Sequence, residues 1–181
     1  MVAKFIYLIG SLRNPKVPEI AAKLREAGHE VFDDWFAAGP EADDHWQRYE
    51  QARGHSFAQA LAGHAGQHVY RYDRSHLDRM GVGVLVLPAG KSGHLELGYM
   101  IGQGKPGYIL LDGEPERFDV MYNFATGVFT NLSDLLKVIG GSIDADVRLQ
   151  VQDGGVLSPV RGHRSLDGGR AEVSELWGRF E

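Results

Sequence analysis

The sequence lacks cysteine altogether, which excludes structural disulfides and zinc sites built on thiolate ligands. It also lacks any apolar run near the roughly 20 residues that a membrane-spanning helix needs. Its first residues, MVAKFIYLIGS, carry one lysine and a short apolar run, without the long apolar region and small-residue cleavage site of a signal peptide. The formal net charge of -5 disfavours non-specific binding to nucleic acid. We therefore expect a soluble, cytoplasmic protein with neither a membrane nor a nucleic-acid polymer as its partner.

The chain is long and apolar enough for one folded domain, with 181 residues of which 43% are hydrophobic. Strands are predicted for residues 4–9, 29–32, 67–72, 82–87 and 108–111. Helices are predicted for residues 17–28, 45–65 with a break near Gly54, 73–80, 94–104 and 132–139, while residues 33–44 are interpreted as a loop and residues 118–129 stay ambiguous. Because strands alternate with helices, the pattern predicts the α/β class, with a parallel sheet, right-handed crossovers and helices on its flanks.

The sequence changes character near residue 140, where glycine pairs begin to interrupt a polar stretch. We divide the chain into an α/β domain at residues 1–140 and a glycine-rich C-terminal extension at residues 141–181. The extension is expected to be partly ordered or to pack on a neighbouring subunit, with an edge strand at residues 147–151 and a short amphipathic helix at residues 171–180. Its glycine and arginine also fit nucleic-acid contact, although aspartate and glutamate are mixed among them.

The most informative stretch, residues 82–106, has the sequence VGVLVLPAGKSGHLELGYMIGQGKP. A buried parallel strand that ends in a glycine-rich loop and leads into a helix is where α/β proteins bind ligands. Glu96 is the acidic residue of this segment and is well placed to act as a carboxylate nucleophile. Asp73 precedes the same strand, and two carboxylates can divide glycosyl chemistry, one attacking and the other handling the proton of the leaving group. The alternative for Glu96 is a residue stabilised by the dipole at a helix N-terminus, and Asp78 is a rival for the second acid.

Two loops have donors suited to an anion or to sugar hydroxyls. After the first strand, Gly10, Ser11 and Arg13 offer backbone N–H groups, a hydroxyl and a guanidinium, although neither a Walker A loop nor a GxGxxG fingerprint is present. Ser92 and Gly93 form a second group of donors after the long strand. Tight turns account for such residues as well, and Arg13 has the alternative of pairing with a surface acid near Asn14.

The eight histidines raise the question of a metal site. His64 and His68 are four residues apart, but no HExxH motif occurs and no acidic ligand has a helpful spacing, so no metal site is predicted. Trp35, Trp46 and Tyr49 are expected either to cover the core or to form the wall of a base pocket by stacking.

Taken together, these residues resemble the nucleoside 2-deoxyribosyltransferase superfamily, which includes the 2'-deoxynucleoside 5'-monophosphate N-hydrolases. The resemblance covers residues 4–111 and is carried by IYLIGSLRN, by Asp73 before the central strand, and by SGHLELGYMIGQGKP at residues 92–106. There are two departures. Met80 and Gly81 replace the usual Ala-Asp of the family, and residues 33–67 are longer and more aromatic than in compact members, which bears on the substrate that is accepted.

The resemblance implies a flavodoxin-like or Rossmann-like fold. It implies cleavage or transfer at the N-glycosidic bond of 2'-deoxynucleosides or their 5'-monophosphates, through a covalent intermediate and without a cofactor. It also implies a homo-oligomer, with Asp119 or Tyr122 as candidates for a residue that completes a neighbouring site.

The same resemblance suggests roles for individual residues. Glu96 matches the nucleophile, Asp73 matches the acid/base that assists the departing or arriving base, and Tyr7 matches an active-site tyrosine of the first strand. The substrate-binding candidates, from the loops and from the resemblance, are Gly10, Ser11, Arg13, Ser92 and Gly93.

Two further functions stay open. TIR-like proteins cleave NAD with a glutamate in an α/β fold, and the spacing of Ser92 and Glu96 permits that reaction. The other possibility is a non-catalytic nucleotide-binding module in which Glu96 binds a ribose hydroxyl.

Overall fold

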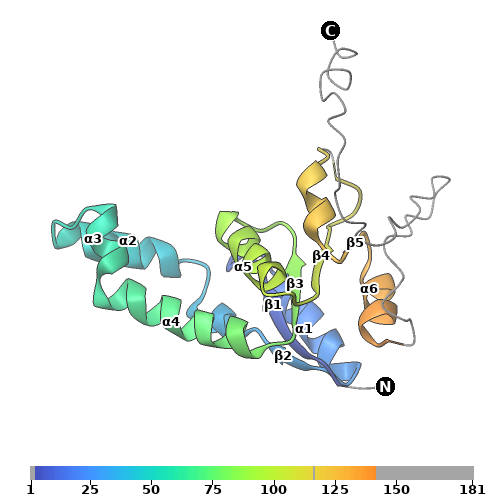
Figure 1. Cartoon of the computed structure of the whole chain (residues 1–181). Helices are drawn as coiled ribbons and strands as arrows, with labels where there is room; N and C mark the ends of the chain where they lie inside the picture. Colours follow the sequence, from blue (N-terminus) through green and yellow to red (C-terminus); the bar gives the residue numbers. More distant parts are fainter. Residues whose placement is uncertain (1–2, 116, 142–181) are drawn as a thin grey trace, which may run out of the picture.

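The computed structural model describes residues 3–115 and 117–141, which build a five-stranded sheet flanked by helices (Figure 1). All neighbouring strands are parallel, in the order β2-β1-β3-β4-β5. The strands are β1 (Phe5–Ile9), β2 (Glu30–Phe32), β3 (Val82–Val86), β4 (Gly107–Leu110) and β5 (Gly127–Phe129). The helices are α1 (Lys16–Glu26), α2 (Ala42–Ala52), α3 (Phe57–Ala62), α4 (His64–Arg79), α5 (Lys91–Gly102) and α6 (Leu132–Ile139), with the short 3-10 helices η1 (Asp34–Ala38) and η2 (Val120–Phe124). The predicted α/β class with a parallel sheet is confirmed.

β3 forms the centre of the sheet, and its sequence VGVLV is buried at every position. A strand covered on both faces needs apolar residues throughout, because helices lie on both sides of a parallel sheet. β1 lies between β3 and β2, with Tyr7 opposite Gly83 on one side and Phe32 on the other. The chain leaves β1 for β2 in one direction and returns to β3 on the other side, so the order of strands reverses between β1 and β3.

The alternation along β1 divides its side chains between two helical layers. Ile6 and Leu8 belong to the core cluster that contains the buried residues of α1 and α6. Tyr7 and Ile9 belong to the other cluster, which contains the buried residues of α4 and α5. Because successive side chains of a strand point to opposite faces, Tyr7 is directed toward the layer of α4 and α5.

α2, α3 and the first half of α4 extend away from the sheet as a helical arm, at the left of Figure 1. The helix predicted for residues 45–65 is divided among α2, α3 and the start of α4. The predicted break is at Gly54, whose φ of +74° is a left-handed conformation that favours glycine. Ser56 and Gln59 start α3 with a reciprocal capping box. In α2 and α3, only Glu50 and Ala60 are buried, so the arm has little core of its own.

Two predictions about local structure are wrong. Residues 67–72 are not a strand but part of α4, where Val69, Tyr70 and Tyr72 are exposed side chains of a helix. Strand-forming residues need a strand to pair with, and none of the described strands pairs with this segment. Residues 33–44 are not a continuous loop, because they contain η1 and the start of α2.

The structure also changes or defines three other predicted segments. The helix predicted for residues 73–80 is the last part of the much longer α4, and α5 begins at Lys91 rather than at residue 94. Residues 118–129, which were ambiguous, form η2 and β5. The helix predicted for residues 132–139 is confirmed as α6.

The predicted strand at residues 147–151 and the predicted helix at residues 171–180 lie outside the described residues, as does the rest of the C-terminal extension from residue 142. Over residues 3–115 and 117–141, no helix is long and apolar enough to cross a membrane.

α5 approaches the sheet closely at Gly93, where a Cβ atom would lie 3.1 Å from Ile9 Cγ2 and 3.1 Å from Leu85 Cδ1. Gly98 lies on the same helix with nothing within 4 Å of the equivalent position. We expect Gly93→Val to destabilise the fold by about 1–3 kcal/mol through overpacking. Gly98→Val is the matched control and is expected to change stability by only about a few tenths of a kcal/mol. Chemical denaturation measures both, and equal stabilities would contradict the close approach of α5.

Candidate active site

The loops that follow β1 and β3 meet at the carboxyl edge of the sheet, where the order of strands reverses. The Nδ2 amide of the buried Asn14 donates to the Pro88 carbonyl at 3.3 Å and so joins the two loops. A crevice of about 170 Å³ lies there, lined by Ser11, Arg13, Asn14, Pro88 and Ala89. Ligands of open α/β sheets bind at such a position. The structure therefore brings two of the predicted substrate-binding residues, Ser11 and Arg13, together in one crevice.

Arg13 already has a partner, but not one near it in the sequence. Its Nη2 donates to Asp44 Oδ2 at 2.7 Å, and Asp44 belongs to α2 of the arm. Both side chains are exposed, with 63% of Arg13 and 44% of Asp44 accessible, so the pair is screened by solvent. The Ser11 Oγ accepts a hydrogen bond from the Arg13 N–H at 3.1 Å. The Ser11 hydroxyl can still donate, and the guanidinium can exchange Asp44 for another anion.

Tyr7, Asp73 and Glu96 come together on the face of the sheet that α4 and α5 cover. Tyr7 lies on β1, Asp73 inside α4 and Glu96 in the second turn of α5. Tyr7 is buried, while both carboxyl groups are half-buried. The charges of Asp73 and Glu96 both influence the Tyr7 hydroxyl, and the charge of Asp73 influences Glu96. The three groups are therefore close enough to interact electrostatically, although they come from three separate elements.

Burial controls the protonation of this group. It raises the pKa of Glu96 from 4.5 to about 7, and the negative charge of Asp73 adds to the rise. Burial also raises the pKa of Asp73, against the opposing effect of His76. The pKa of Tyr7 is raised far above its usual range by burial and by the two carboxylates, so the tyrosine stays a neutral phenol. Two coupled acids of this kind can hold one proton between them near neutral pH, which suits acid/base work.

The raised pKa of Glu96 argues against the dipole alternative. A carboxylate stabilised at a helix N-terminus has its charged form favoured and its pKa lowered. Glu96 lies beyond the first turn of α5, and no acidic residue occupies that turn. No hydrogen bond from a described residue contributes to the pKa shift of Glu96 or of Asp73. Glu96 is thus a desolvated acid without a compensating partner, as expected for a group reserved for a ligand.

Asp78, the rival for the second acid, is engaged elsewhere. Its carboxylate accepts hydrogen bonds from Tyr99, Gln103 and Arg74 on the exposed side of α4. These donors lower the pKa of Asp78 to about 2, Tyr99 having the largest effect. An acid held ionised in this way is a poor proton donor, so Asp73 is the better candidate.

An aromatic cluster beside Tyr7 was missed from the sequence. The Phe32 ring stacks on His76 with centroids 3.8 Å apart, Tyr72 lies 4.6 Å from His76, and Tyr7 lies 5.0 Å from Phe32. Two patterns were available to find it. Phe32 ends the strand beside β1, and Tyr72 and His76 are four residues apart on the helix that carries Asp73.

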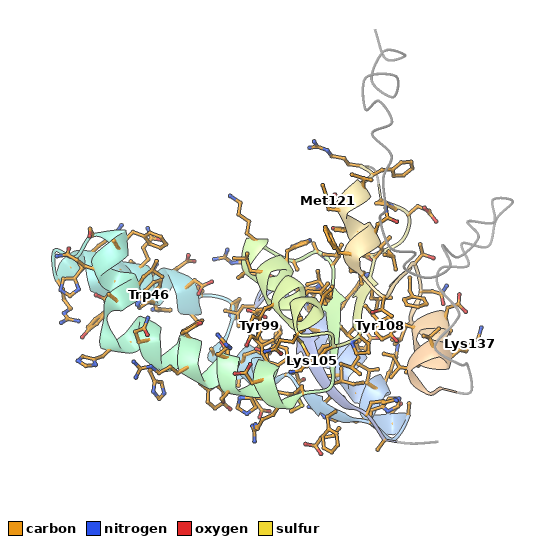
Figure 2. The ribbon with its side chains drawn as sticks, viewed as in Figure 1. Trp46, Tyr99, Lys105, Tyr108, Met121 and Lys137 are labelled. Atoms are coloured by element: carbon orange, nitrogen blue, oxygen red, sulfur yellow. The ribbon has the colours of Figure 1, made fainter. Side chains whose placement is uncertain are left out.

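Trp35, Trp46 and Tyr49, the candidates for the wall of a base pocket, do not lie together in the structure. Trp46 packs against Gly66 within the arm, away from the sheet (Figure 2), and Tyr49 is exposed beneath Arg53. Trp35 lies near the site, because its Nε1 donates to the Leu8 carbonyl at 2.8 Å at the end of β1. Trp46 and Tyr49 are therefore arm residues, and that part of the hypothesis is wrong.

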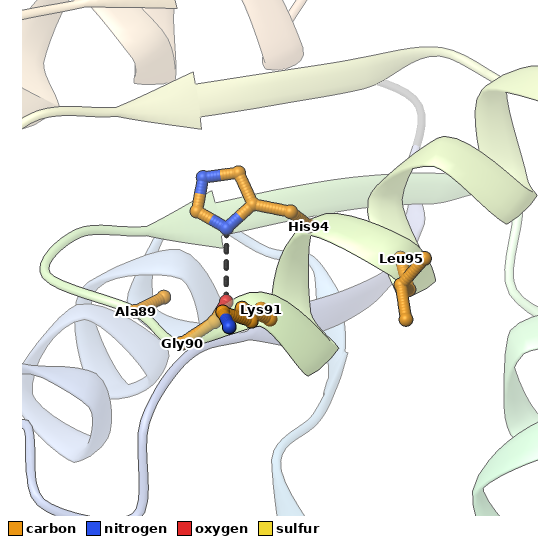
Figure 3. Close-up of a pocket in the computed structure, with 5 residues that line it drawn as sticks. All are labelled: Ala89, Gly90, Lys91, His94 and Leu95. Atoms are coloured by element: carbon orange, nitrogen blue, oxygen red, sulfur yellow. Dashed lines mark hydrogen bonds between the residues drawn. The ribbon is translucent and has the colours of Figure 1, made fainter.

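A second cavity, of about 600 Å³, lies at the start of α5 and is lined by Ala89, Gly90, Lys91, His94 and Leu95 (Figure 3). The His94 Nδ1–H donates to the Gly90 carbonyl at 2.9 Å, which leaves Nε2 to accept from the Tyr122 hydroxyl at 3.3 Å. Tyr7, Asp73 and Glu96 line neither this cavity nor the 170 Å³ crevice, so cavity size does not identify the reaction site.

Ser92 and Gly93 line neither cavity. Ser92 is exposed in the first turn of α5, and Gly93 is buried against the sheet. Gly10 also serves packing, since a Cβ atom there would lie 2.7 Å from Val17 Cγ2. Asp119 caps η2 by accepting from the Met121 N–H at 2.9 Å. Within the two described ranges, no three side chains of His, Asp or Glu gather as metal ligands.

Comparisons with known proteins give matches of structure alone. The chain is similar to a 2-deoxyribosyltransferase from Bacillus psychrosaccharolyticus, with 20% identity, a TM-score of 0.48, and coverage of 72% of this chain and 89% of that one. It is also similar to a CMP N-glycosidase from Clostridium botulinum, with 12% identity, a TM-score of 0.45, and coverage of 74% and 96%. No protein-family model matches the chain, and no curated protein matches it. The first enzyme bears the name of the family that the sequence resembles, but at these identities and scores the likeness says nothing of the reaction of this chain.

The raised pKa of Glu96 predicts an effect on stability. Between pH 4.5 and about 7, the folded protein holds a proton on Glu96 that the unfolded chain releases, so this group makes stability fall as pH rises. We expect Glu96→Gln to be more stable than the parent at pH 8, by up to about 3 kcal/mol, with the gain vanishing below pH 4.5. Urea denaturation at pH 8 and pH 4.5 measures the gain, with the exposed Glu26→Gln as control. A parallel pH dependence of parent and Glu96→Gln would show that Glu96 is solvated like any surface acid.

Proposed function

We propose that this protein cleaves the N-glycosidic bond of 2'-deoxynucleosides or their 5'-monophosphates through a covalent intermediate on Glu96. The deoxyribosyl group then passes either to water or to a second base. The observation that carries the proposal is the pair Asp73 and Glu96, two interacting, desolvated acids beside a neutral tyrosine. They lie on α4 and α5, the helices on either side of β3 in the chain, and the loops at the carboxyl ends of β1 and β3 form a crevice with an exposed guanidinium. Paired carboxylates are the groups that glycosyl chemistry uses, and this arrangement supplies them.

In the first step, an ionised Glu96 oxygen attacks C1' of the deoxyribose. The bond from C1' to the base nitrogen breaks, its electron pair stays with the base, and a proton from Asp73 neutralises the departing base. In the second step, water or a second base attacks C1' and the ester bond to Glu96 breaks. Asp73 takes the proton that this nucleophile loses, which returns both acids to their starting states.

The reactive form has the proton on Asp73 and the charge on Glu96. In the free protein, the high pKa of Glu96 favours the opposite arrangement. A sugar whose C1' becomes positively charged beside Glu96 stabilises its carboxylate, so the favourable form is reached as the bond to the base breaks. The Tyr7 hydroxyl stays protonated and can donate a hydrogen bond to the Glu96 carboxylate or to the sugar ring.

The remaining residues orient the substrate. The Ser11 hydroxyl and the Arg13 guanidinium suit a 5'-phosphate, since a guanidinium binds phosphate through paired N–H donors. Tyr72, which is exposed and lies beside His76 on the helix that carries Asp73, offers an aromatic surface where a departing base is expected to lie, while Phe32 is buried behind His76. Holding reactants in this way supplies much of the acceleration in such reactions.

The deciding experiment is a base-release assay on 2'-deoxynucleosides, their 5'-monophosphates and NAD, with and without an added acceptor base. We expect release from the deoxy compounds, and we expect Glu96→Ala to lower kcat by at least about a thousandfold because the nucleophile is lost. Glu26→Ala, on the exposed face of α1, is the matched control and should behave like the parent. Dependence on the acceptor identifies a transferase, and release without one identifies a hydrolase.

Other outcomes would contradict the proposal. Nicotinamide release from NAD alone would assign the NAD-cleaving activity instead. Tight stoichiometric binding of a nucleotide without release of any base would make the protein a binding module.

Arg13 provides a test for the 5'-phosphate. We expect Arg13→Ala to raise KM for monophosphates about tenfold or more, with little effect on nucleosides, because in the proposed complex the guanidinium contacts the phosphate and no other part of the substrate. Asp44→Ala is the companion variant: it removes the competing carboxylate at 2.7 Å and should leave monophosphate KM unchanged or lower. Equal losses on nucleosides and monophosphates in Arg13→Ala would mean that Arg13 serves the loop rather than the phosphate.

A further inference from the structure

The contact between α4 and α5 contains a polar cluster that takes no direct part in the proposed reaction. Its centre is the Asp78 carboxylate near the end of α4. Tyr99 Oη donates to Asp78 Oδ1 at 2.5 Å, and Gln103 Nε2 donates to the same oxygen at 2.9 Å. Both donors come from the second half of α5 or the residue that follows it. One carboxylate on α4 therefore holds two successive turns at the end of α5.

Arg74 strengthens the cluster from the side of α4. Its Nε donates to both oxygens of Asp78 at 3.2 Å, and its guanidinium lies 4.2 Å from the centre of the Tyr99 ring. Arg74 directly follows Asp73 in the sequence. The residue next to the candidate acid is thus fixed to the helix that carries the candidate nucleophile.

Lys105 joins the same two helices through backbone carbonyls at their ends. Its Nζ donates to the Leu77 carbonyl at 2.6 Å and to the Asp78 carbonyl at 2.8 Å, in the last turn of α4. Its own N–H donates to the Met100 carbonyl near the end of α5 at 3.1 Å. Tyr99 and Lys105 are both labelled in Figure 2, where α5 passes the end of α4. The lysine of the GKP motif thereby ties the end of one helix to the end of the other.

We propose that Asp78, Tyr99, Gln103 and Lys105 form a clamp that positions Asp73 against Glu96, and that these four are positioning residues for the proposed reaction. The inference rests on the proposed function. Glu96 lies three residues before Tyr99 on α5, and Asp73 lies five residues before Asp78 on α4. Because helices are rigid over such short lengths, a fixed spacing at the clamp fixes the spacing of the two acids.

α4 has particular need of a clamp. Its first half belongs to the arm, which has little core of its own, and only Leu77 within the helix is buried. Exposed ion pairs and hydrogen bonds contribute little to global stability, so removing the clamp is expected to shift α4 rather than unfold the protein. A displacement of about 1 Å between reacting groups is enough to lower a rate on the order of a hundredfold.

The titration of Glu96 reports on the position of α4. The titratable groups near Glu96 are Asp73 on α4 and Tyr7 on β1. Asp73 is near Glu96 and Tyr7, and also near His76 on its own helix. If α4 moves outward, Glu96 gains water and loses the nearby charge of Asp73. Both changes lower the pKa of Glu96 from about 7 toward 4.5.

The test uses Tyr99→Phe, which removes the hydrogen bond of Tyr99 to Asp78, and Lys105→Met, which removes both hydrogen bonds of Lys105 Nζ to α4, with Asp78→Ala as the strongest disruption. The matched controls are Asp134→Ala and Lys137→Met, which remove an exposed pair of the same chemistry at 2.7 Å on α6. We expect the clamp variants to lose kcat on the order of 10- to 100-fold with KM changed much less. The acid limb of kcat/KM against pH should move down by about one unit. The controls should match the parent, and Asp78→Asn, which keeps an acceptor, should recover part of the loss.

The titration of Glu96 is also followed by the carboxyl ¹³C shift of labelled protein, which needs no turnover. A lowered midpoint in the clamp variants, but not in the controls, supports the clamp even if the parent releases no base and the proposed function fails. Clamp variants that match the controls in both kcat and Glu96 midpoint would overturn the proposal, leaving the cluster as a surface contact between helices. If Asp78→Ala or Lys105→Met does not fold, Tyr99→Phe alone decides the test, because it keeps the ring under Arg74.

Discussion

The arrangement of this protein depends on two half-buried carboxyl groups that are partly withdrawn from water without an ion pair to any described residue. Taking an ionised carboxylate from water into a protein is costly unless it is paired. Among the described residues neither Glu96 nor Asp73 forms an ion pair, and each has a raised pKa, although the charge of His76 opposes the rise at Asp73. The rest of the fold must supply the free energy that holds them there, and the fully buried strand β3 with the two helical layers beside it is its main source.

The close packing around β1 makes that arrangement possible. Alternation in β1 directs Tyr7 into the layer of α4 and α5, and the lack of a side chain at Gly93 lets α5 lie directly on β1 and β3. Glu96 follows Gly93 by one turn, so the close approach of the helix also determines how deeply the acid is buried. A glycine expected to bind substrate is thus better explained by helix packing, and its effect on the site is indirect.

Much of the frame followed from local pattern, whereas the contacts of the site did not. The continuous apolar run of β3 and the helical period of α1 reflect burial that each element imposes on its own residues. The partner of Arg13 is Asp44, thirty-one residues away, and no local pattern indicates that pairing. Residues 67–72 were mistaken for a strand because Val69, Tyr70 and Tyr72 favour sheets, yet tertiary context keeps them helical and exposed. His76 was overlooked because its importance lies in stacking on Phe32 from a distant strand.

The arm touches the candidate site at two places, and this gives it a consequence for binding. α2 provides Asp44 to the guanidinium of Arg13, and α4 continues from the arm to Asp73. An anion that takes the place of Asp44 on Arg13 removes one of the contacts that hold the arm against the loop after β1. Binding at one end of the crevice and the position of the helix that carries the acid are therefore linked through the arm, and by thermodynamic reciprocity each must influence the other. The proposed clamp between α4 and α5 limits how far such a movement of α4 changes the spacing of Asp73 and Glu96.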